Sequence, residues 1–159
     1  MRKRLLSIVT AAAFAGCAQV REMTHEKEVD GNLVACPANK MSIGDVPSCG
    51  KVWKLTWGSA TLKGNGDLNV EVTGLVLNDF STGDANGTPD GVDAVAAAVL
   101  CRGPNGLQVA AQTEAVTLSR KGDARIKTHV NVPSCIAAVI VLRERYEGKI
   151  GGWLAATGI

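Results

Sequence analysis

Apolar and polar residues alternate in short runs along most of the chain after residue 51. In Leu68–Thr73 and again in Arg125–Val132, every second residue is apolar or β-branched, and this period of two predicts strands with one buried face. Gly64–Asp67 predicts a hairpin turn, because Gly and Asn tolerate the positive φ that tight turns need. Seven strands are expected, at residues 53–57, 68–77 with a bulge at Gly74, 92–102, 107–119 with a break near Thr113, 125–132, 135–142 and 153–157.

Two of these segments are apolar on both faces. The alanines of Val92–Arg102 also suit a helix, but its valines and the glycines on either side favour a strand. Cys135–Leu142 has the pattern expected of a central strand. Short strands at regular spacing, with almost no helix, predict an all-β antiparallel fold: a β-sandwich of the immunoglobulin-like or Greek-key type, or a small barrel.

The first 16 residues have a different character. Three cations, Arg2, Lys3 and Arg4, precede the apolar run Leu5–Ala15, and small residues follow. This is the pattern of a secretory signal peptide, and the run is too short for a spanning helix, which needs roughly 20 apolar residues. Ala13-Phe14-Ala15 also fits ordinary cleavage. We therefore expect residues 1–16 to be removed on export.

Ala15-Gly16-Cys17 resembles the bacterial lipobox, although Phe14 stands where Leu is usual. The resemblance implies that the Cys17 thiol is acylated and that the chain is lipid-anchored in the cell envelope. It further implies the outer membrane in a Gram-negative host, because Ala18 follows the cysteine. Cysteine parity favours lipidation independently: of five cysteines, four remain once Cys17 is used, and four can pair fully.

We expect the polar segment 17–34 to be a tether and residues 35–159 to form one domain. Four cysteines permit three pairings. Cys36–Cys49 would close an irregular loop, and Cys101–Cys135 would link two predicted strands, so this is the pairing we expect. Without residues 1–16 the chain has 14 Lys and Arg against 15 Asp and Glu, a net charge of −1. No basic patch therefore points to nucleic acid.

The segment 78–93 carries the most suggestive chemistry. Its oxygen-bearing side chains resemble those of Ca²⁺ loops, which gather carboxylates and carbonyls from closely spaced residues. It departs from an EF-hand, since counting from Asp84 places Pro89 where Gly is needed and Val95 where Glu is needed. A polar turn loop is the simpler interpretation. The weak metal candidates are Asp84, Asn86, Asp90 and Asp93.

Other candidate residues are few. Trp53 and Trp57 should share a strand face, where they could stack on sugar rings, although core packing is the commoner role. His129 falls on the polar side of its predicted strand, and no Gly-x-Ser-x-Gly elbow accompanies it. No cofactor-binding motif is present, and no catalytic residue is assigned.

Part of the chain resembles a family of small uncharacterised exported bacterial all-β proteins. The resemblance covers Leu75–Ile159 and rests on Val99-Leu100-Cys101-Arg102-Gly103, on Val132-Pro133-Ser134-Cys135 and on the Trp153 end. It implies an exported, disulfide-bonded all-β fold. The family carries no established activity, so the resemblance implies nothing about mechanism.

The sequence thus favours a non-enzymatic envelope lipoprotein, an interaction or structural module with a lipid-mediated membrane contact and an envelope protein or glycan as partner. One alternative is a protein that binds a small ligand, a glycan or Ca²⁺ through residues 78–93 or the tryptophan pair. Another is an envelope hydrolase with an unrecognised site. A buried cluster of His129 with carboxylates and a hydroxyl would favour the hydrolase; convergent oxygens from the 78–93 segment would favour the metal.

Overall fold

A computed structural model describes residues 28–37, 41–133, 135 and 138–158. Nine of the strands in these residues form one sheet in the order β7-β6-β10-β11-β1-β3-β4-β9, with β8 paired to β6, and β2 and β5 form a second small sheet. The elements are β1 (Val29–Ala35), β2 (Trp53–Lys54), β3 (Trp57–Leu62), β4 (Asp67–Thr73), β5 (Val76–Leu77), the 3₁₀ helix η1 (Phe80–Ala85), β6 (Ala94–Gly103), β7 (Gly106–Gln112), β8 (Val116–Thr117), β9 (Ala124–His129), β10 (Val139–Tyr146) and β11 (Lys149–Thr157).

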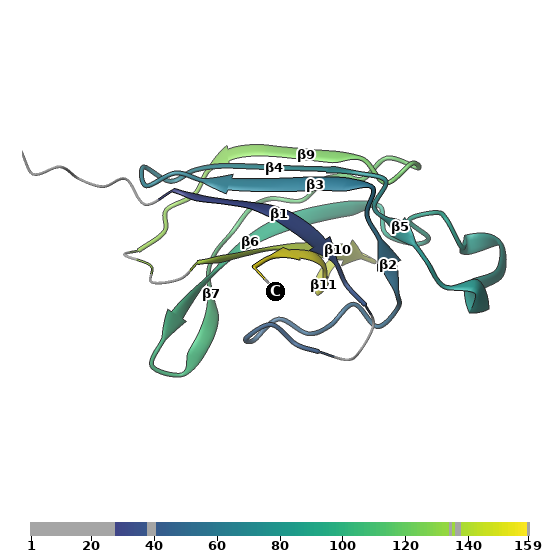
Figure 1. The fold of residues 1–159 in the computed structure, drawn as a ribbon, viewed down its shortest axis with the longest axis horizontal. Helices are drawn as coiled ribbons and strands as arrows, with labels where there is room; N and C mark the ends of the chain where they lie inside the picture. The colour runs from purple at the N-terminus through teal and green to yellow at the C-terminus, as the bar shows by residue number, and fades with distance from the viewer. Residues whose placement is uncertain (1–27, 38–40, 134, 136–137, 159) are drawn as a thin grey trace, which may run out of the picture.

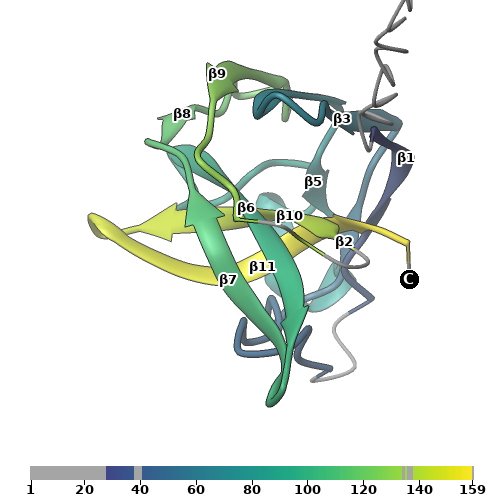
Figure 2. The ribbon, with the colours of Figure 1, turned by 90° about the vertical axis from the view of Figure 1, so that its left-hand side faces the viewer.

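The large sheet curls into a half-barrel (Figure 1). β3, β4 and β9 form one layer, β6, β10 and β11 lie across from it, and β1 joins the two halves between β11 and β3. All strand pairs of this sheet are antiparallel. β8 pairs with β6 and also contacts β9. The free edge of the sheet at β9 therefore lies close to β6 (Figure 2). The all-β antiparallel fold predicted from the sequence is confirmed.

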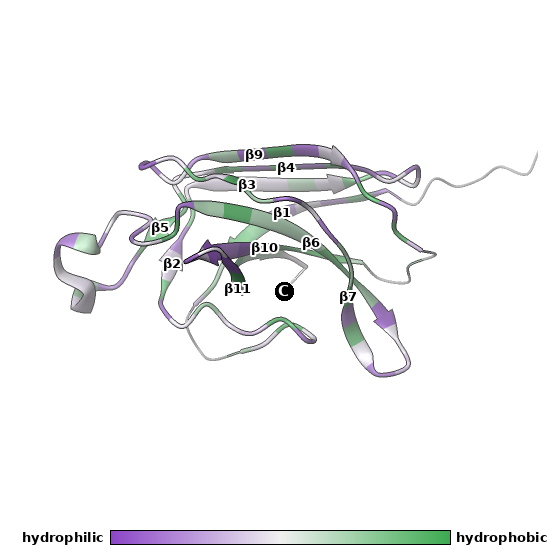
Figure 3. Cartoon of the chain, turned by 180° about the vertical axis from the view of Figure 1, so that it is seen from behind, coloured by the Kyte–Doolittle hydropathy of each residue, from purple (hydrophilic) through white to green (hydrophobic). Residues whose placement is uncertain are grey.

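The core is centred on β6, β10 and β11. Seven consecutive residues of β6, Ala94–Leu100, are buried, and so are the five residues Trp153–Thr157 of β11. β6 is largely green in Figure 3 because it has no polar face. The alanines of this segment do not form a helix. β10 pairs with β6 along Ala94–Leu100 and supplies the hydrogen-bond partners that the backbone of a strand needs. The strand interpretation of this segment is confirmed.

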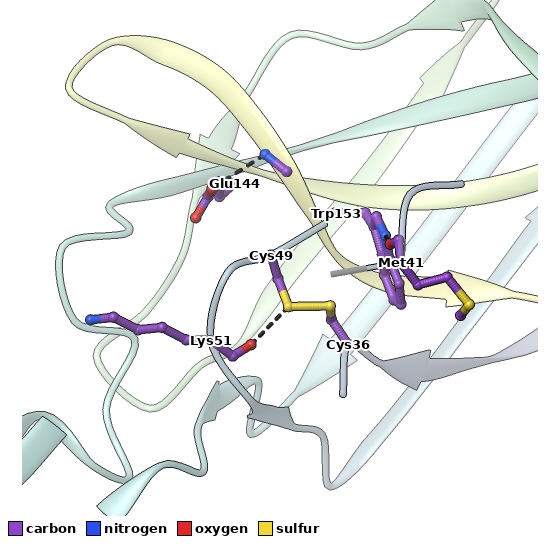
Figure 4. The surroundings of a disulfide bond; sticks show 7 residues. Cys36, Met41, Cys49, Lys51, Glu144 and Trp153 are labelled. Atoms are coloured by element: carbon purple, nitrogen blue, oxygen red, sulfur yellow. Dashed lines mark hydrogen bonds between the residues drawn. A yellow bond between two sulfur atoms is a disulfide. The ribbon is translucent and has the colours of Figure 1, made fainter. Parts of the chain in front are cut away.

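The loop 41–49 is fastened to β11 from outside the sheet. The indole Nε1 of Trp153 donates a 2.9 Å hydrogen bond to the carbonyl of Met41, and the two residues lie side by side (Figure 4). The Trp153 backbone N–H donates to the carbonyl of Pro47 at 3.0 Å. A disulfide joins Cys36, which follows β1, to Cys49. A second disulfide joins Cys101 of β6 to Cys135, ahead of β10. These are the two pairs that the sequence analysis expected.

Several expected boundaries are wrong, and the strand expected at 135–142, for example, is β10, Val139–Tyr146. Residues 29–34 are not part of a tether: they belong to β1, which pairs with β11 on one side and β3 on the other. Their polar side chains hid the strand, because the outer face of β1 is exposed. The last strand, expected at 153–157, begins earlier, since β11 starts at Lys149 after the tight turn Glu147-Gly148. Only glycine fits at residue 152, because the carbonyl oxygen of Ser48 occupies the space that a Cβ would need.

The first long strand is also divided. β2 ends at Lys54 and β3 begins at Trp57, so the expected strand 53–57 is two elements in different sheets. Gly74 is not a bulge within one strand but the corner between β4 and β5. Its φ of 68° places it in the left-handed region, and its N–H donates to Asp123 Oδ1 at 3.0 Å.

We expect Trp153 to contribute more to the free energy of unfolding than Trp57 does. Trp153→Phe removes the indole donor to the Met41 carbonyl and part of a fully buried ring, and we expect a loss of about 2 kcal/mol of unfolding free energy. Trp57→Phe, at a half-exposed position, is the control and should change stability by less than about 0.5 kcal/mol. Urea unfolding followed by circular dichroism measures both. Equal losses would contradict the role given to Trp153.

Candidate functional site

The four weak metal candidates do not converge in the structure. The Asp84 side chain is exposed at the end of η1. The other three side chains are each engaged with a different partner: Asn86 Oδ1 accepts from the Asp79 backbone N–H at 2.9 Å, Asp90 pairs with Lys51 at 4.0 Å and Asp93 pairs with Arg145 at 2.9 Å. In the part of the chain that the structure describes, no group of three or more His, Cys, Asp or Glu side chains is placed to hold a metal ion.

The two candidate tryptophans do not share a face, which corrects the sequence interpretation. Trp53 is 5% exposed and belongs to the core, whereas Trp57 is 50% exposed on the outer face of β3. The break at residues 55–56 between β2 and β3 separates them, because an uninterrupted strand would have kept residues two and four apart on one side. Trp57 alone is available as an aromatic platform.

His129 lies at the surface and not in a buried cluster. Its Nδ1 is 3.3 Å from Asp67 Oδ1, and the two side chains are 65% and 58% exposed. The hydrogen bond from His129, followed by the one from the Asn65 amide, lowers the pKa of the Asp67 carboxyl below its usual value. The pair links the end of β9 to the start of β4.

Asp67 also borders a hollow of about 580 Å³ on the outer face of the layer β3-β4-β9. We call it the β3-β4-β9 hollow. Its volume falls within the range of small-molecule sites, roughly 300–1,000 Å³. Sequence reasoning did not single out this site. Its lining residues are Thr61, Lys63, Asp67, Leu68, Asn69, Arg125, Lys127 and Thr128.

Strand register builds the hollow from residues far apart in sequence. Thr61 on β3 pairs with Asn69 on β4, which pairs with Lys127 on β9, so the three side chains form a row across the outer face. Inner residues of the same strands, such as Val70 and Ile126, are buried in the core. The strict alternation seen in β4 therefore places every polar side chain of that strand on the side of the hollow.

The charges around the hollow are only partly paired. Arg125 lies 3.8 Å from Glu71, and Asp67 is engaged with His129. Within the described residues, the ammonium groups of Lys63 and Lys127 have no ion-pair or hydrogen-bond partner. Two cations on one rim of a polar hollow attract an anionic group.

Asn69 stands in the centre of the row and has an unsatisfied polar atom. Its Oδ1 is buried and accepts no hydrogen bond from the described protein. A buried acceptor without a donor costs about 1–3 kcal/mol, so such atoms are uncommon and call for an explanation. The atom is closed to solvent, and Trp53 Nε1 and Arg145 Nε are likewise buried without a partner among the described residues, so it does not mark the hollow as a ligand site.

Comparisons with protein-family models, with curated proteins and with solved structures find no match for this chain. The resemblance to exported all-β proteins therefore stays a prediction. Cys17 and the expected signal peptide lie outside the described residues. Among the residues that are described, no helix is long and apolar enough to cross a membrane.

A second ionisable group, Glu144 on β10, lies away from the hollow near the Cys36–Cys49 disulfide (Figure 4). Its Oε1 accepts a 3.2 Å hydrogen bond from the Gly152 N–H. Burial raises the pKa of the Glu144 carboxyl above its usual value, against the smaller opposing effects of that hydrogen bond and of Lys51. Folding therefore disfavours the charged form of Glu144 relative to its charged form in the unfolded chain.

This pKa shift has a consequence for stability. Because the folded state holds the Glu144 proton more tightly than the unfolded chain, stability falls as the pH rises from about 4.5 through the raised folded pKa. Glu144→Gln keeps the acceptor for Gly152 and removes the charge, so its melting temperature should exceed the wild-type value at pH 7 and equal it near pH 3. Glu114→Gln, at an exposed position, is the control and should show no difference. A Glu144→Gln protein that is less stable at pH 7 would contradict this account.

Proposed function

We propose that this protein is a non-enzymatic binding module of the bacterial cell envelope, held there by lipid on Cys17. It presents the β3-β4-β9 hollow to a ligand. The observation that carries the proposal is the open polar hollow with two unpaired ammonium groups, Lys63 and Lys127, on its rim. The two lysines differ from the other exposed lysines, such as Lys54 and Lys121, in bordering the same hollow.

The envelope location is supported by cysteine usage. The described cysteines form two disulfides, which persist in oxidising compartments such as the periplasm. Of the five cysteines in the chain, Cys17 alone takes no part in them. Acylation of this remaining thiol fits the lipobox-like Ala15-Gly16-Cys17.

Binding is favoured over catalysis by the surroundings of His129. A His that serves as general base works best in a site that excludes water and holds it against a nucleophile. The His129 side chain is 65% exposed, and the partner of its ring is a carboxylate, Asp67. The geometry thus provides a surface hydrogen bond between His129 and Asp67 beside a hollow.

Mass spectrometry of the protein isolated from envelopes tests the anchor. We expect an N-terminal Cys17 carrying acyl chains, and release of Cys17→Ser protein into the soluble fraction. Several acyl chains anchor a protein stably, whereas a single chain binds only marginally. An N-terminus at Gly16, or an unmodified Cys17, would show that cleavage is of the ordinary kind.

Sedimentation tests the binding face. Full-length protein in mild detergent is mixed with purified cell-wall material and with lipopolysaccharide, and the bound fraction is measured. Lys63→Ala/Lys127→Ala should lose at least about tenfold in apparent affinity, equivalent to about 1.4 kcal/mol. The matched control is Lys54→Ala/Lys121→Ala, two exposed lysines outside the hollow, and should bind as the wild type does. Equal binding by the two double variants would refute the proposed face.

A further inference from the structure

We infer that Asn86 is the acceptor of an N-linked glycan, attached at its side-chain amide nitrogen. Asn86-Gly87-Thr88 fits the acceptor sequence Asn-x-Ser/Thr, in which x is any residue except proline. None of the other asparagines in the chain has Ser or Thr two residues later. The inference goes beyond the proposed binding face and rests on one part of the proposed function, the export of the chain.

The segment 78–93, which carries Asn86, is open to large partners. It projects from the fold at the end opposite to the start of β1 (Figure 1, Figure 3). η1 contains no buried residue, and the Phe80 side chain is 88% exposed. A Cβ at Gly83 or at Gly87 would have no atom within 4 Å, so there is free space before and after Asn86 along the chain. An enzyme and a bulky saccharide can therefore reach this segment without displacing the sheet.

The two ends of the Asn86 amide group have different roles. Oδ1 accepts a 2.9 Å hydrogen bond from the Asp79 backbone N–H and so holds the two ends of η1 together. Among the described residues, no group accepts a hydrogen bond from Nδ2. N-glycosylation replaces one hydrogen of Nδ2 and leaves the amide oxygen in place. The contact that shapes the segment is therefore compatible with the modification.

The transfer needs two partners from the envelope membrane: an oligosaccharyltransferase and a saccharide activated as a lipid-linked diphosphate. Nδ2 attacks the anomeric carbon of the saccharide, and a nitrogen–carbon bond forms as the carbon–oxygen bond to the diphosphate breaks. The lipid diphosphate leaves with the electron pair, and Nδ2 passes one proton to a base of the enzyme. No atom is oxidised or reduced.

Thr88 supplies the hydroxyl that the acceptor sequence requires. Its Oγ1 donates to the Ala85 carbonyl at 2.7 Å and accepts from the Asp90 N–H at 3.3 Å. For the transfer, this hydroxyl exchanges the Ala85 carbonyl for an acceptor on the enzyme. Pro89 is buried, and its carbonyl accepts from the Val92 N–H at 3.0 Å, which keeps the chain after Thr88 attached to the fold. Only the turn from Ala85 to Thr88 therefore has to open.

Asp84, two residues before Asn86, gives the acceptor segment a charged contact. Its side chain is exposed and has no ion-pair partner among the described residues. A cationic group of the enzyme can pair with this carboxylate without breaking a contact of the fold. Hydrogen bonds between ionised groups are stronger than those between neutral ones, so we expect Asp84 to raise the fraction of Asn86 that carries a glycan.

Two further Asn-Gly turns serve as comparisons within the same molecule. Asn65 and Asn105 are exposed, and each is followed by glycine, as Asn86 is. The residues at the third position are Asp67 and Leu107, neither of which has a hydroxyl. A glycan confined to Asn86 would therefore depend on the acceptor sequence and not on exposure.

Mass spectrometry of intact glycopeptides tests the inference. The full-length protein is produced in a bacterial host together with a single-subunit oligosaccharyltransferase and its lipid-linked oligosaccharide, and is purified from whole cells. We expect a glycopeptide that spans Asn86 and unglycosylated peptides that span Asn65 and Asn105. The mass of the attached saccharide is the readout, because Asn-Gly sequences also deamidate spontaneously and a deamidated asparagine is no evidence of a glycan.

Matched variants separate the acceptor sequence from the fold of the segment. Thr88→Val keeps the shape of the side chain without its hydroxyl and should carry no glycan, whereas Thr88→Ser should carry it. Asp84→Ala should lower the glycosylated fraction severalfold, and Asp90→Ala, at an exposed position outside the acceptor sequence, should leave it unchanged. The melting temperature of the glycosylated protein should be no lower than that of the unmodified protein, because Asn86 Oδ1 keeps its bond to Asp79.

An unmodified Asn86 would overturn the inference, and so would a glycan on the Thr88→Val protein, on Asn65 or on Asn105. Equal glycosylated fractions in Asp84→Ala and the wild type would remove the role given to Asp84. The proposed function is judged separately, because acylation of Cys17 in the same sample reports the anchor and lysine-dependent sedimentation reports the binding face. A glycan on Asn86 beside an unmodified Cys17 would support the inference and contradict the anchor.

Discussion

The rest of the structure depends on burying both faces of β6, β10 and β11. A strand such as Ala94–Leu100, with seven consecutive buried residues, cannot lie on a surface and needs a cover on each side. The chain supplies one cover by curling its own sheet through β1, so that β3, β4 and β9 lie opposite. The loop 41–49, with Ile43 and Val46 in the same apolar core, packs against β11 and is held by a disulfide and by Trp153.

The curl also determines where ligand chemistry can lie. β3, β4 and β9 give their apolar residues to the core and keep a second face that the sheet does not cover. Polar residues on that face come into rows through strand pairing, and the rows place Thr61, Asn69 and Lys127 side by side. The layer that closes the core is therefore also the layer that presents the hollow.

The polar groups of the outer face stabilise the sheet little. Lys63 and Lys127 are exposed to water and need no protein partner, whereas the buried Oδ1 of Asn69 accepts no hydrogen bond from the described protein, which costs about 1–3 kcal/mol. Other parts of the structure hold both kinds of group: Arg143 donates to the Gly151 carbonyl and to Gln112, and Asp123 accepts from Gly74, whereas Trp53 Nε1 and Arg145 Nε are buried without a partner among the described residues. The Cys36–Cys49 and Cys101–Cys135 bridges offset such costs by restricting the unfolded chain.

The sequence by itself determined the strands whose pattern is local. Alternation in Leu68–Thr73 and the two-sided apolar run at Ala94–Leu100 predicted an antiparallel all-β fold, and the spacing of cysteines indicated the pairs that the structure contains. Only the tertiary structure showed β1, since its polar residues become a strand through pairing with β11 and β3. Only it separated Trp53 from Trp57 and gathered Lys63, Asn69 and Lys127 into one hollow. The reason is physical: periodicity reports which face of a strand is buried, whereas register between distant strands decides which exposed residues meet.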